Sequence, residues 1–268
     1  MAVDSSAKVH DTAIIEDGAE IGANCDIGPY AVVGSDVRLL GGVKLHSHAV
    51  VHGYTEIGDQ TEIFPFASIG HMPQDLKFSG ERTQLIVGKR NRIREHVTMN
   101  PGTEGGGGVT KVGDNGLYMM SCHVGHDCIV GNNVIIANNV ALGGHCIIED
   151  HVVIGGLAGI HQFTRIGRGA MIGGLAGVVS DVIPYGTVLG ERASLGGLNL
   201  IGLKRAGVGR EDVDGLRQAY KLLFNTGKPL SDAIEDVRGM AADNALIEEV
   251  LAFIGEAGKR RITTPQDT

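Results

Sequence analysis

Aliphatic residues recur at every sixth position along the first two thirds of the chain. The series breaks at residues 71–84 and again at the glycine-rich segment NPGTEGGGG, and after each break it continues in steps of six. A period of six fits neither an amphipathic helix nor simple alternation over this length. Only Tyr118 is neither aliphatic nor methionine. The members of the series are Val3, Val9, Ile15, Ile21, Ile27, Val33, Leu39, Leu45, Val51, Ile57, Ile63, Ile69, Val87, Ile93, Met99, Val112, Tyr118, Val124, Val130, Ile136, Leu142, Ile148, Ile154, Ile160, Ile166, Ile172 and Val178.

A second track of small residues runs in step with the first. Alanine, cysteine or threonine usually stands four positions after an aliphatic member. A parallel β-helix built from hexapeptides explains both tracks, because the aliphatic and the small side chain point inward while the other positions face solvent or form bends. The 42 glycines supply the backbone angles that such bends require. Adjacent coils should stack at about 4.8 Å, the usual distance between neighbouring strands.

The pattern becomes helical after the repeat ends. From about residue 191, segments such as REDVDGLRQAYKLLFNTG and ALIEEVLAFIGEAG indicate helices. We therefore predict a mostly β fold, with a parallel β-helix over residues 1–190 and loop insertions near residues 71–84 and 100–110. An α-helical C-terminal domain is expected over residues 191–268.

Charge and hydropathy exclude several classes of function. The formal net charge is −8 and the chain has no long basic run, which argues against nucleic-acid binding. It also has no apolar run long enough for an integral membrane segment, and the N-terminal MAVDSSAKVHD lacks the apolar core of a signal peptide. We expect a cytoplasmic protein.

The four cysteines all fall on the track of small inward residues. They occupy the same place in the repeat as the alanines, so we interpret them as small buried residues. This argues against a disulfide, a metal-ligand role or a nucleophilic thiol. The residues are Cys25, Cys122, Cys128 and Cys146.

The histidines of the segment CHVGHDCIVG gain partners from the fold. In known hexapeptide-repeat proteins three hexads close one left-handed coil, so by this resemblance residues eighteen apart lie one above another. Four histidines then gather on one edge across three adjacent coils: His123, His126, His145 and His161. The predicted columns on this edge are His126, Gly144 and Gln162; Asp127, His145 and Phe163; and Gly125, Gly143 and His161.

Three interpretations of this edge are open. The histidines could be scattered surface residues, or three of them could bind a zinc ion, although the pair five residues apart found in hexapeptide carbonic anhydrases is missing. General-base chemistry accounts for more of the pattern. A neutral imidazole at His126 could accept a proton from a hydroxyl, and Asp127 could orient it. The backbone N–H of Gly144, one coil away, could donate to a developing oxyanion.

Five segments resemble the UDP-N-acetylglucosamine 3-O-acyltransferase family of lipid A biosynthesis, and the resemblance covers nearly the whole chain. They are QDLKFSGE (74–81), NRIREHVT (91–98), HVGHDCIVGN (123–132), IHQF (160–163) and GLNLIGLKRAG (197–207). The resemblance implies a homotrimer of left-handed β-helices with active sites between subunits. It implies direct transfer of an (R)-3-hydroxyacyl group from acyl carrier protein to the glucosamine 3-hydroxyl of UDP-GlcNAc. No cofactor and no metal are expected.

The same resemblance implies roles for individual residues. His126 matches the general base, Asp127 its neighbour and Gly144 the oxyanion donor. Gly174 matches the residue that limits acyl length, and its small size predicts a groove for roughly a C12–C16 chain, at about 0.8 kcal/mol per buried methylene. Matches to substrate-binding positions are Asp75, Lys77, His123, His145, His161, Gln162, Asn199 and Arg205. The basic stretch 204–228 is either a solvated helix face or a dock for acyl carrier protein that includes Arg217 and Lys221.

The chain departs from the family pattern at several positions. Ala206 and Ile201 stand where a second cation and a polar contact are expected, and Asn100-Pro101 replaces a common His-Arg pair. An amine acceptor on a 3-amino sugar, the related N-acyltransferase and uridylyltransferase activities, and a non-catalytic scaffold therefore remain alternatives. The two related enzymes are less favoured, because each carries a further domain before its hexads, and these hexads start at Val3. The TEGGGG segment lacks the Walker pattern, and we expect it to be a flexible excursion from one coil.

Overall fold

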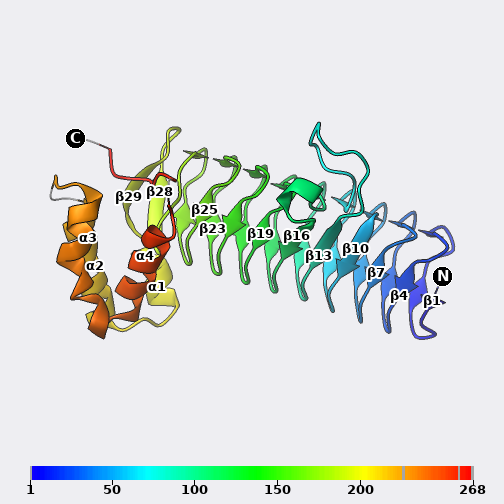
Figure 1. Ribbon diagram of the computed structural model, residues 1–268. Helices are drawn as coiled ribbons and strands as arrows, with labels where there is room; N and C mark the ends of the chain where they lie inside the picture. The colour runs from blue at the N-terminus through cyan, green and yellow to red at the C-terminus, as the bar shows by residue number, and fades with distance from the viewer. Residues whose placement is uncertain (1, 225–226, 259, 267–268) are drawn as a thin grey trace.

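Each predicted hexad forms one short strand that ends at its aliphatic residue. The computed structural model describes residues 2–224, 227–258 and 260–266. The strands form three sheets, called A, B and C here, which are the three faces of a long parallel β-helix (Figure 1). Sheet A contains β1 (Ala2–Val3), β4 (Glu20–Ile21), β7 (Arg38–Leu39), β10 (Tyr54–Ile57), β13 (Gln84–Val87), β16 (Val109–Val112), β19 (Ile129–Val130), β22 (Ile147–Ile148) and β25 (Arg165–Ile166).

The other two faces are built in the same way. Sheet B contains β2 (Lys8–Val9), β5 (Asp26–Ile27), β8 (Lys44–Leu45), β11 (Glu62–Ile63), β14 (Arg92–Ile93), β17 (Leu117–Tyr118), β20 (Ile135–Ile136), β23 (Val153–Ile154), β26 (Met171–Ile172), β28 (Gly186–Leu189) and β29 (Ser194–Leu198). Sheet C contains β3 (Ile14–Ile15), β6 (Val32–Val33), β9 (Val50–Val51), β12 (Ser68–Ile69), β15 (Thr98–Met99), β18 (His123–Val124), β21 (Ala141–Leu142), β24 (Gly159–Ile160) and β27 (Gly177–Val178).

The strands of successive coils pair in parallel and in register. Ile21 pairs with Leu39, eighteen residues later, and the same step joins Leu39 to Ile57. Backbone hydrogen bonds connect the coils, as between the Gly22 N–H and the Leu39 carbonyl at 2.8 Å. The predicted coil of three hexads is therefore confirmed.

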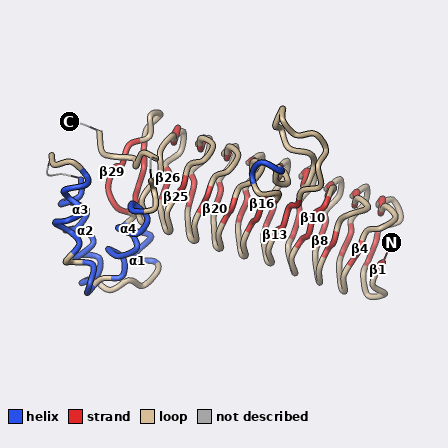
Figure 2. The backbone as a smooth tube through the Cα atoms, in the orientation of Figure 1, coloured by secondary structure: helices blue, strands red, loops and turns tan. Residues whose placement is uncertain are grey.

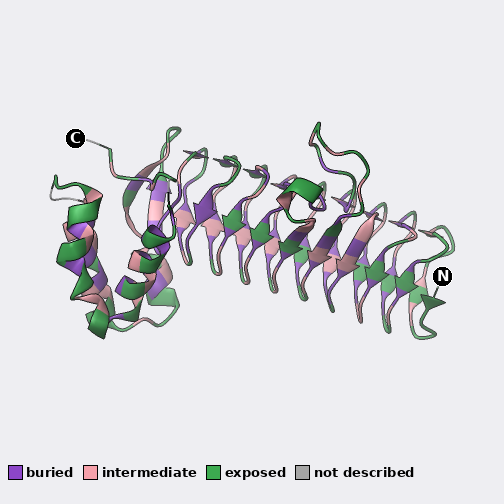
Figure 3. Cartoon of the chain, in the orientation of Figure 1, coloured by how far each residue is buried: buried purple, intermediate pink, exposed green. Residues whose placement is uncertain are grey.

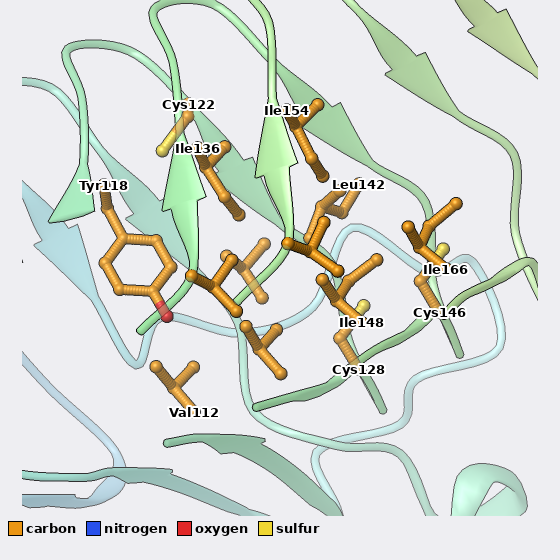
Figure 4. Close-up of a cluster of buried hydrophobic side chains, with 14 of the residues drawn as sticks. Val112, Tyr118, Cys122, Cys128, Ile136, Leu142, Cys146, Ile148, Ile154 and Ile166 are labelled. Carbon is orange, nitrogen blue, oxygen red and sulfur yellow. The ribbon is translucent and has the colours of Figure 1, made fainter. Parts of the chain in front are cut away.

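The aliphatic and small tracks together form the core. Almost all of their members are buried, and the four cysteines are free thiols inside the coil, as predicted. Burial raises the pKa of Cys122 to about 12, so this thiol is not a nucleophile at neutral pH. Figure 4 shows part of this core, in which the ring of Tyr118 lies among aliphatic side chains. Its hydroxyl is buried and has no hydrogen-bond partner among the described residues.

Both predicted interruptions leave the prism as loops, within a residue or two of the expected bounds. Residues 70–83 connect β12 to β13, and residues 100–108 connect β15 to β16. The first loop stands out from the prism (Figure 1), and the second contains the short 3₁₀ helix η1, Glu104–Gly106 (Figure 2). The coil register survives both loops, because Ile57 pairs with Val87 and Val87 pairs with Val112.

The last strand was not expected. Residues 194–198 were predicted to be helical, but they form β29, which pairs antiparallel with β28 and extends sheet B. This prediction was wrong because tertiary pairing decides the conformation of the glycine-rich SLGGL segment. Helices follow only from Leu200: α1 (Leu200–Arg205), α2 (Arg210–Phe224), α3 (Leu230–Arg238), the 3₁₀ helix η2 (Ala241–Asp243) and α4 (Ala245–Gly255).

The helices lie at the C-terminal end of the prism, with their buried sides turned inward (Figure 3). A buried ion pair joins the two parts. Arg165 of β25 is 5% exposed and donates to Asp181, which is 1% exposed, at 2.8 Å, and it also donates to the carbonyl of Phe253 in α4 at 2.9 Å. Arg260 donates to the same carboxylate at 3.1 Å. No helix within the described ranges is both long and apolar enough to span a membrane.

Candidate active site

The predicted columns meet at the corner between sheets C and A. We call residues 125–127, 143–145 and 161–163 the histidine corner. The N–H of His145 donates to the carbonyl of His126 at 2.9 Å, and the N–H of Phe163 donates to the carbonyl of Gly144 at 3.0 Å. These bonds confirm that the residues predicted to share columns lie on adjacent coils.

His126 and Asp127 form a hydrogen-bonded pair. Nδ1 of His126 lies 2.7 Å from Oδ2 of Asp127, whose side chain is completely buried. An ionised carboxylate can only accept, so Nδ1 carries the hydrogen and Nε2 is left with a free lone pair. Asp127 has φ +59°, a left-handed conformation that aspartate tolerates better than most residues. The bend of the coil thus places the carboxylate beside the preceding imidazole.

The second loop closes over this carboxylate. The N–H of Thr103 donates to Oδ1 of Asp127 at 2.8 Å, and the Thr103 hydroxyl donates to Oδ2 at 2.7 Å. The N–H of Asp127 donates to the Thr110 hydroxyl at 2.7 Å. The TEGGGG segment was expected to be a flexible excursion, and this was wrong, because Thr103 fixes its first turn to a buried charge. Neither Thr103 nor Thr110 was recognised from the sequence.

Gly144 lies against the ring of His126. A Cβ at this position would stand 2.5 Å from Cε1 and 2.6 Å from Nε2 of His126, so only glycine fits. Its N–H has no acceptor in the part of the chain that the structure describes. A free amide beside a free Nε2 matches the expected juxtaposition of an oxyanion donor and a general base.

The other three histidines differ in environment. His123 Nδ1 lies 2.7 Å from the hydroxyl of Thr98, and burial together with the neighbouring His126 lowers the pKa of His123. His145 stacks on Phe163 with ring centroids 4.4 Å apart. Burial lowers the pKa of His145, although the carboxylate of Asp127 opposes this effect. His161 is exposed, and its Nδ1 lies 3.1 Å from the carbonyl of Gln162.

A cleft runs from the histidine corner along the outer face of sheet C. Its floor consists of small or flat residues, which leave room for an extended ligand beside the imidazole of His126. The lining residues are Gln74, Asn100, His123, Gly125, His126, Ala141, Leu142, Gly143, Gly144, Gly159, Ile160, His161, Gln162, Gly177, Val178 and Val179.

The first loop reaches the same cleft. Gln74 is a lining residue, and the nearby charges of Asp75 and Lys77 act on His145 in opposite directions. Asn100 holds the base of this loop, because its side-chain Nδ2 donates to the carbonyl of His71 at 2.9 Å. Its Oδ1 is buried and unpaired among the described residues. Asn100 was noted in the sequence only as a departure from the family pattern.

Other predicted site residues lie elsewhere on this chain. Asn199 caps α1: its Oδ1 accepts from the N–H of Gly202 at 2.9 Å, and its Nδ2 donates to the carbonyl of Gly169 at 2.9 Å. Arg205 is exposed in the last turn of α1, and neither residue lines the cleft. Gly174 is exposed at the opposite edge of sheet C from His126. Arg217 and Lys221 are exposed on α2, where Arg217 lies 3.5 Å from Asp214.

One group of side chains has the spacing of a metal site. His126, Asp127 and His145 each offer a ligand atom, and these atoms lie within 4.8 Å of one another. Oδ2 of Asp127, however, already accepts hydrogen bonds from His126 and Thr103. An ion there would have to replace the bond that orients His126. We therefore assign this carboxylate to the imidazole.

Known proteins share both this sequence and this fold. Residues 181–263 match the family described as "Udp N-acetylglucosamine O-acyltransferase; Domain 2". The chain is 50% identical to an "Acyl-[acyl-carrier-protein]--UDP-N-acetylglucosamine O-acyltransferase" of Anaeromyxobacter dehalogenans, over 95% of this chain and 99% of the relative. It is 47% identical to a protein of the same description from Aliarcobacter butzleri, over 92% and 94%.

Solved structures agree with these relatives. A crystal structure of a UDP-N-acetylglucosamine acyltransferase superposes with a TM-score of 0.91 at 42% identity, covering 97% of this chain and all of that one. The corresponding enzyme from Campylobacter jejuni has a TM-score of 0.89 at 36% identity, with the same coverage. Identity at this level over nearly the full length of both chains shows that this chain belongs to the acyl-[acyl-carrier-protein]–UDP-N-acetylglucosamine O-acyltransferase family.

Proposed function

We propose that this chain transfers an (R)-3-hydroxyacyl group from acyl carrier protein to the 3-hydroxyl of the GlcNAc of UDP-GlcNAc, in the first step of lipid A biosynthesis. The observation that supports this most directly is the pairing of His126 with Asp127 beneath the bare amide of Gly144. The names of the relatives supply the donor and the acceptor.

The reaction needs one base and one oxyanion donor. Nε2 of His126 takes the proton of the sugar 3-hydroxyl while the oxygen attacks the thioester carbonyl of the acyl donor. The Gly144 N–H stabilises the negative charge that develops on the carbonyl oxygen. Asp127 stabilises the imidazolium, which then returns its proton to the departing thiolate. The acyl group passes directly to the sugar, and the chain itself is not acylated.

The remaining predicted residues have assigned places in this proposal. Asp75 and Lys77 on the first loop bind the sugar nucleotide, and His123, His145, His161 and Gln162 line its site. Asn199 and Arg205 do not lie in the cleft of their own chain, so we assign their contacts with uridine diphosphate to a cleft completed by a neighbouring subunit. The assembly is then a cytoplasmic homotrimer of left-handed β-helices. The prism over residues 1–190 carries the chemistry, and residues 191–268 complete the nucleotide site.

Acyl length follows from the same arrangement. Gly174 and His126 occupy opposite edges of sheet C, so one acyl groove joins them only between subunits. With glycine at its end the groove accepts roughly a C12–C16 chain, at about 0.8 kcal/mol per buried methylene. Transfer of a C10 acyl group at an equal or higher kcat/KM would contradict this assignment.

Docking of the carrier is assigned to the basic face of α2. Arg217 and Lys221 are exposed and attract an acidic partner. Reversing both charges should raise the KM for the acyl carrier protein several-fold while the KM for UDP-GlcNAc stays constant. An unchanged carrier KM would instead favour a solvated helix face.

One assay separates the proposed function from its alternatives. Wild type and His126→Ala are compared with UDP-GlcNAc and 3-hydroxyacyl carrier protein, and in parallel with the 3-amino analogue of the sugar. We expect the hydroxyl acceptor to be used and the variant to lose about 10²- to 10⁴-fold in kcat. Preference for the amine indicates N-acylation, and a loss of only a few-fold rejects His126 as the base. No turnover with either acceptor indicates a scaffold.

A further inference from the structure

Asp127 is held from outside its own coil. Both of its carboxylate oxygens accept hydrogen bonds from one residue, Thr103, at 2.8 Å and 2.7 Å. The second of these shares Oδ2 with the bond to His126. Without Thr103, this carboxylate would retain the imidazole as its one side-chain donor within the described residues, and its rotation would no longer be fixed.

The turn that follows Thr103 closes the same pocket. Gly106 lies so near the carboxylate that a Cβ there would stand 2.0 Å from Cγ of Asp127. Gly105, its neighbour in the same 3₁₀ helix, would place a Cβ with no atom within 4 Å. The turn therefore approaches Asp127 at a single glycine, and it seals the carboxylate from solvent.

We propose that Thr103, with the turn 103–106, is the positioning element of the catalytic pair. Thr103 holds Asp127, and Asp127 keeps the hydrogen of His126 on Nδ1 so that Nε2 faces the acceptor hydroxyl. This inference rests on the proposed role of His126 as the base. It assigns to the second loop a part in the chemical step, separate from substrate binding.

The first experiment compares Thr103→Val with Thr103→Ser. Valine keeps the shape and the backbone N–H but removes the hydroxyl donor, and serine keeps both donors. The valine variant should lose about ten- to one-hundred-fold in kcat, the size expected for one hydrogen bond to a charged group, with both KM values unchanged. Serine should restore most of the rate. Equal losses in the two variants, or a raised KM at constant kcat, would overturn the proposal.

The second experiment uses the neighbouring glycines. Gly106→Ala should reduce kcat at constant KM because its methyl group displaces Asp127, whereas Gly105→Ala should keep the wild-type rate. Equal rates for the two variants would contradict the role of the turn. This pair also decides the matter if Thr103→Val does not fold, which thermal melting reports.

His126→Ala keeps the two proposals apart. If it is inactive while Thr103→Val turns over within twofold of wild type, the positioning role is wrong and the proposed function stands. If His126→Ala is itself active, the proposed base is wrong, and a loss in Thr103→Val would then have no route through the imidazole.

Discussion

Gly144 stands in van der Waals contact with the imidazole of His126, so close that a methyl group at this position would overlap Cε1 and Nε2. Gly144→Ala should therefore displace the imidazole even though it keeps the backbone N–H. We expect kcat to fall about 10²-fold or more, as for other losses within an oxyanion site, with a melting temperature near that of wild type. Steady-state kinetics and thermal melting test this, and a rate within fivefold of wild type would contradict the contact.

Asn100 connects the first loop to the coil beneath the histidine corner. Asn100→Asp keeps the shape of the side chain but replaces the donor to the His71 carbonyl with an acceptor. We expect the KM for UDP-GlcNAc to rise about tenfold, because the loop that carries Asp75 and Lys77 loses its fixed base. Titration of the sugar nucleotide by calorimetry should show the same loss. Unchanged affinity would mean that the loop is held by other contacts.

Tyr118 carries a hydroxyl that the core does not satisfy. Burial raises the pKa of this group, and it has no partner among the described residues. Tyr118→Phe should leave the free energy of unfolding unchanged or raise it by about 1 kcal/mol, since a buried unpaired hydroxyl is costly. Tyr118→Ala, which leaves a cavity, should cost about 3–5 kcal/mol. Denaturant titration measures both, and a clear loss in the phenylalanine variant would reveal a partner for the hydroxyl.

Arg165 and Asp181 should show how strongly the helices depend on the prism. Asp181→Ala leaves two arginines without their carboxylate, one of them buried, and should cost about 3–5 kcal/mol in the free energy of unfolding. The exposed pair of Glu20 and Arg38, 3.3 Å apart, provides the control. Glu20→Ala should change stability by less than about 1 kcal/mol. Similar losses in the two variants would argue against a structural joint at Asp181.

His123 predicts a dependence of stability on pH. Its pKa is lowered in the folded chain by burial and by the neighbouring His126, whereas the unfolded value is about 6.5. The unfolded chain then takes up a proton as the pH falls below about 6.5 and the folded chain does not, so stability is full above this pH and declines below it. His123→Gln should decline less between about pH 7.5 and pH 5. An equal decline in both proteins would mean that His123 does not contribute.

The repeat predicted the fold and the core of the candidate site because both depend on spacing. A step of six places the aliphatic residues inside, and a step of eighteen brings His126 next to Gly144 although other hexads separate them. The contacts of Thr103 and Asn100 depend instead on two loops outside the repeat, where no period relates one residue to another. The strand at residues 194–198 was missed for a similar reason, since its conformation depends on the pairing partner supplied by β28.

The continuity of the register across both loops has a consequence for how such a chain can change in length. A whole coil added or removed near the N-terminus leaves every later rung in phase, so the corner beside the imidazole keeps its geometry. A single residue lost between Asp127 and Gly144 turns all the following faces of the prism by one position and separates the base from its amide. In this protein a deletion of one residue should therefore do more harm than a deletion of eighteen.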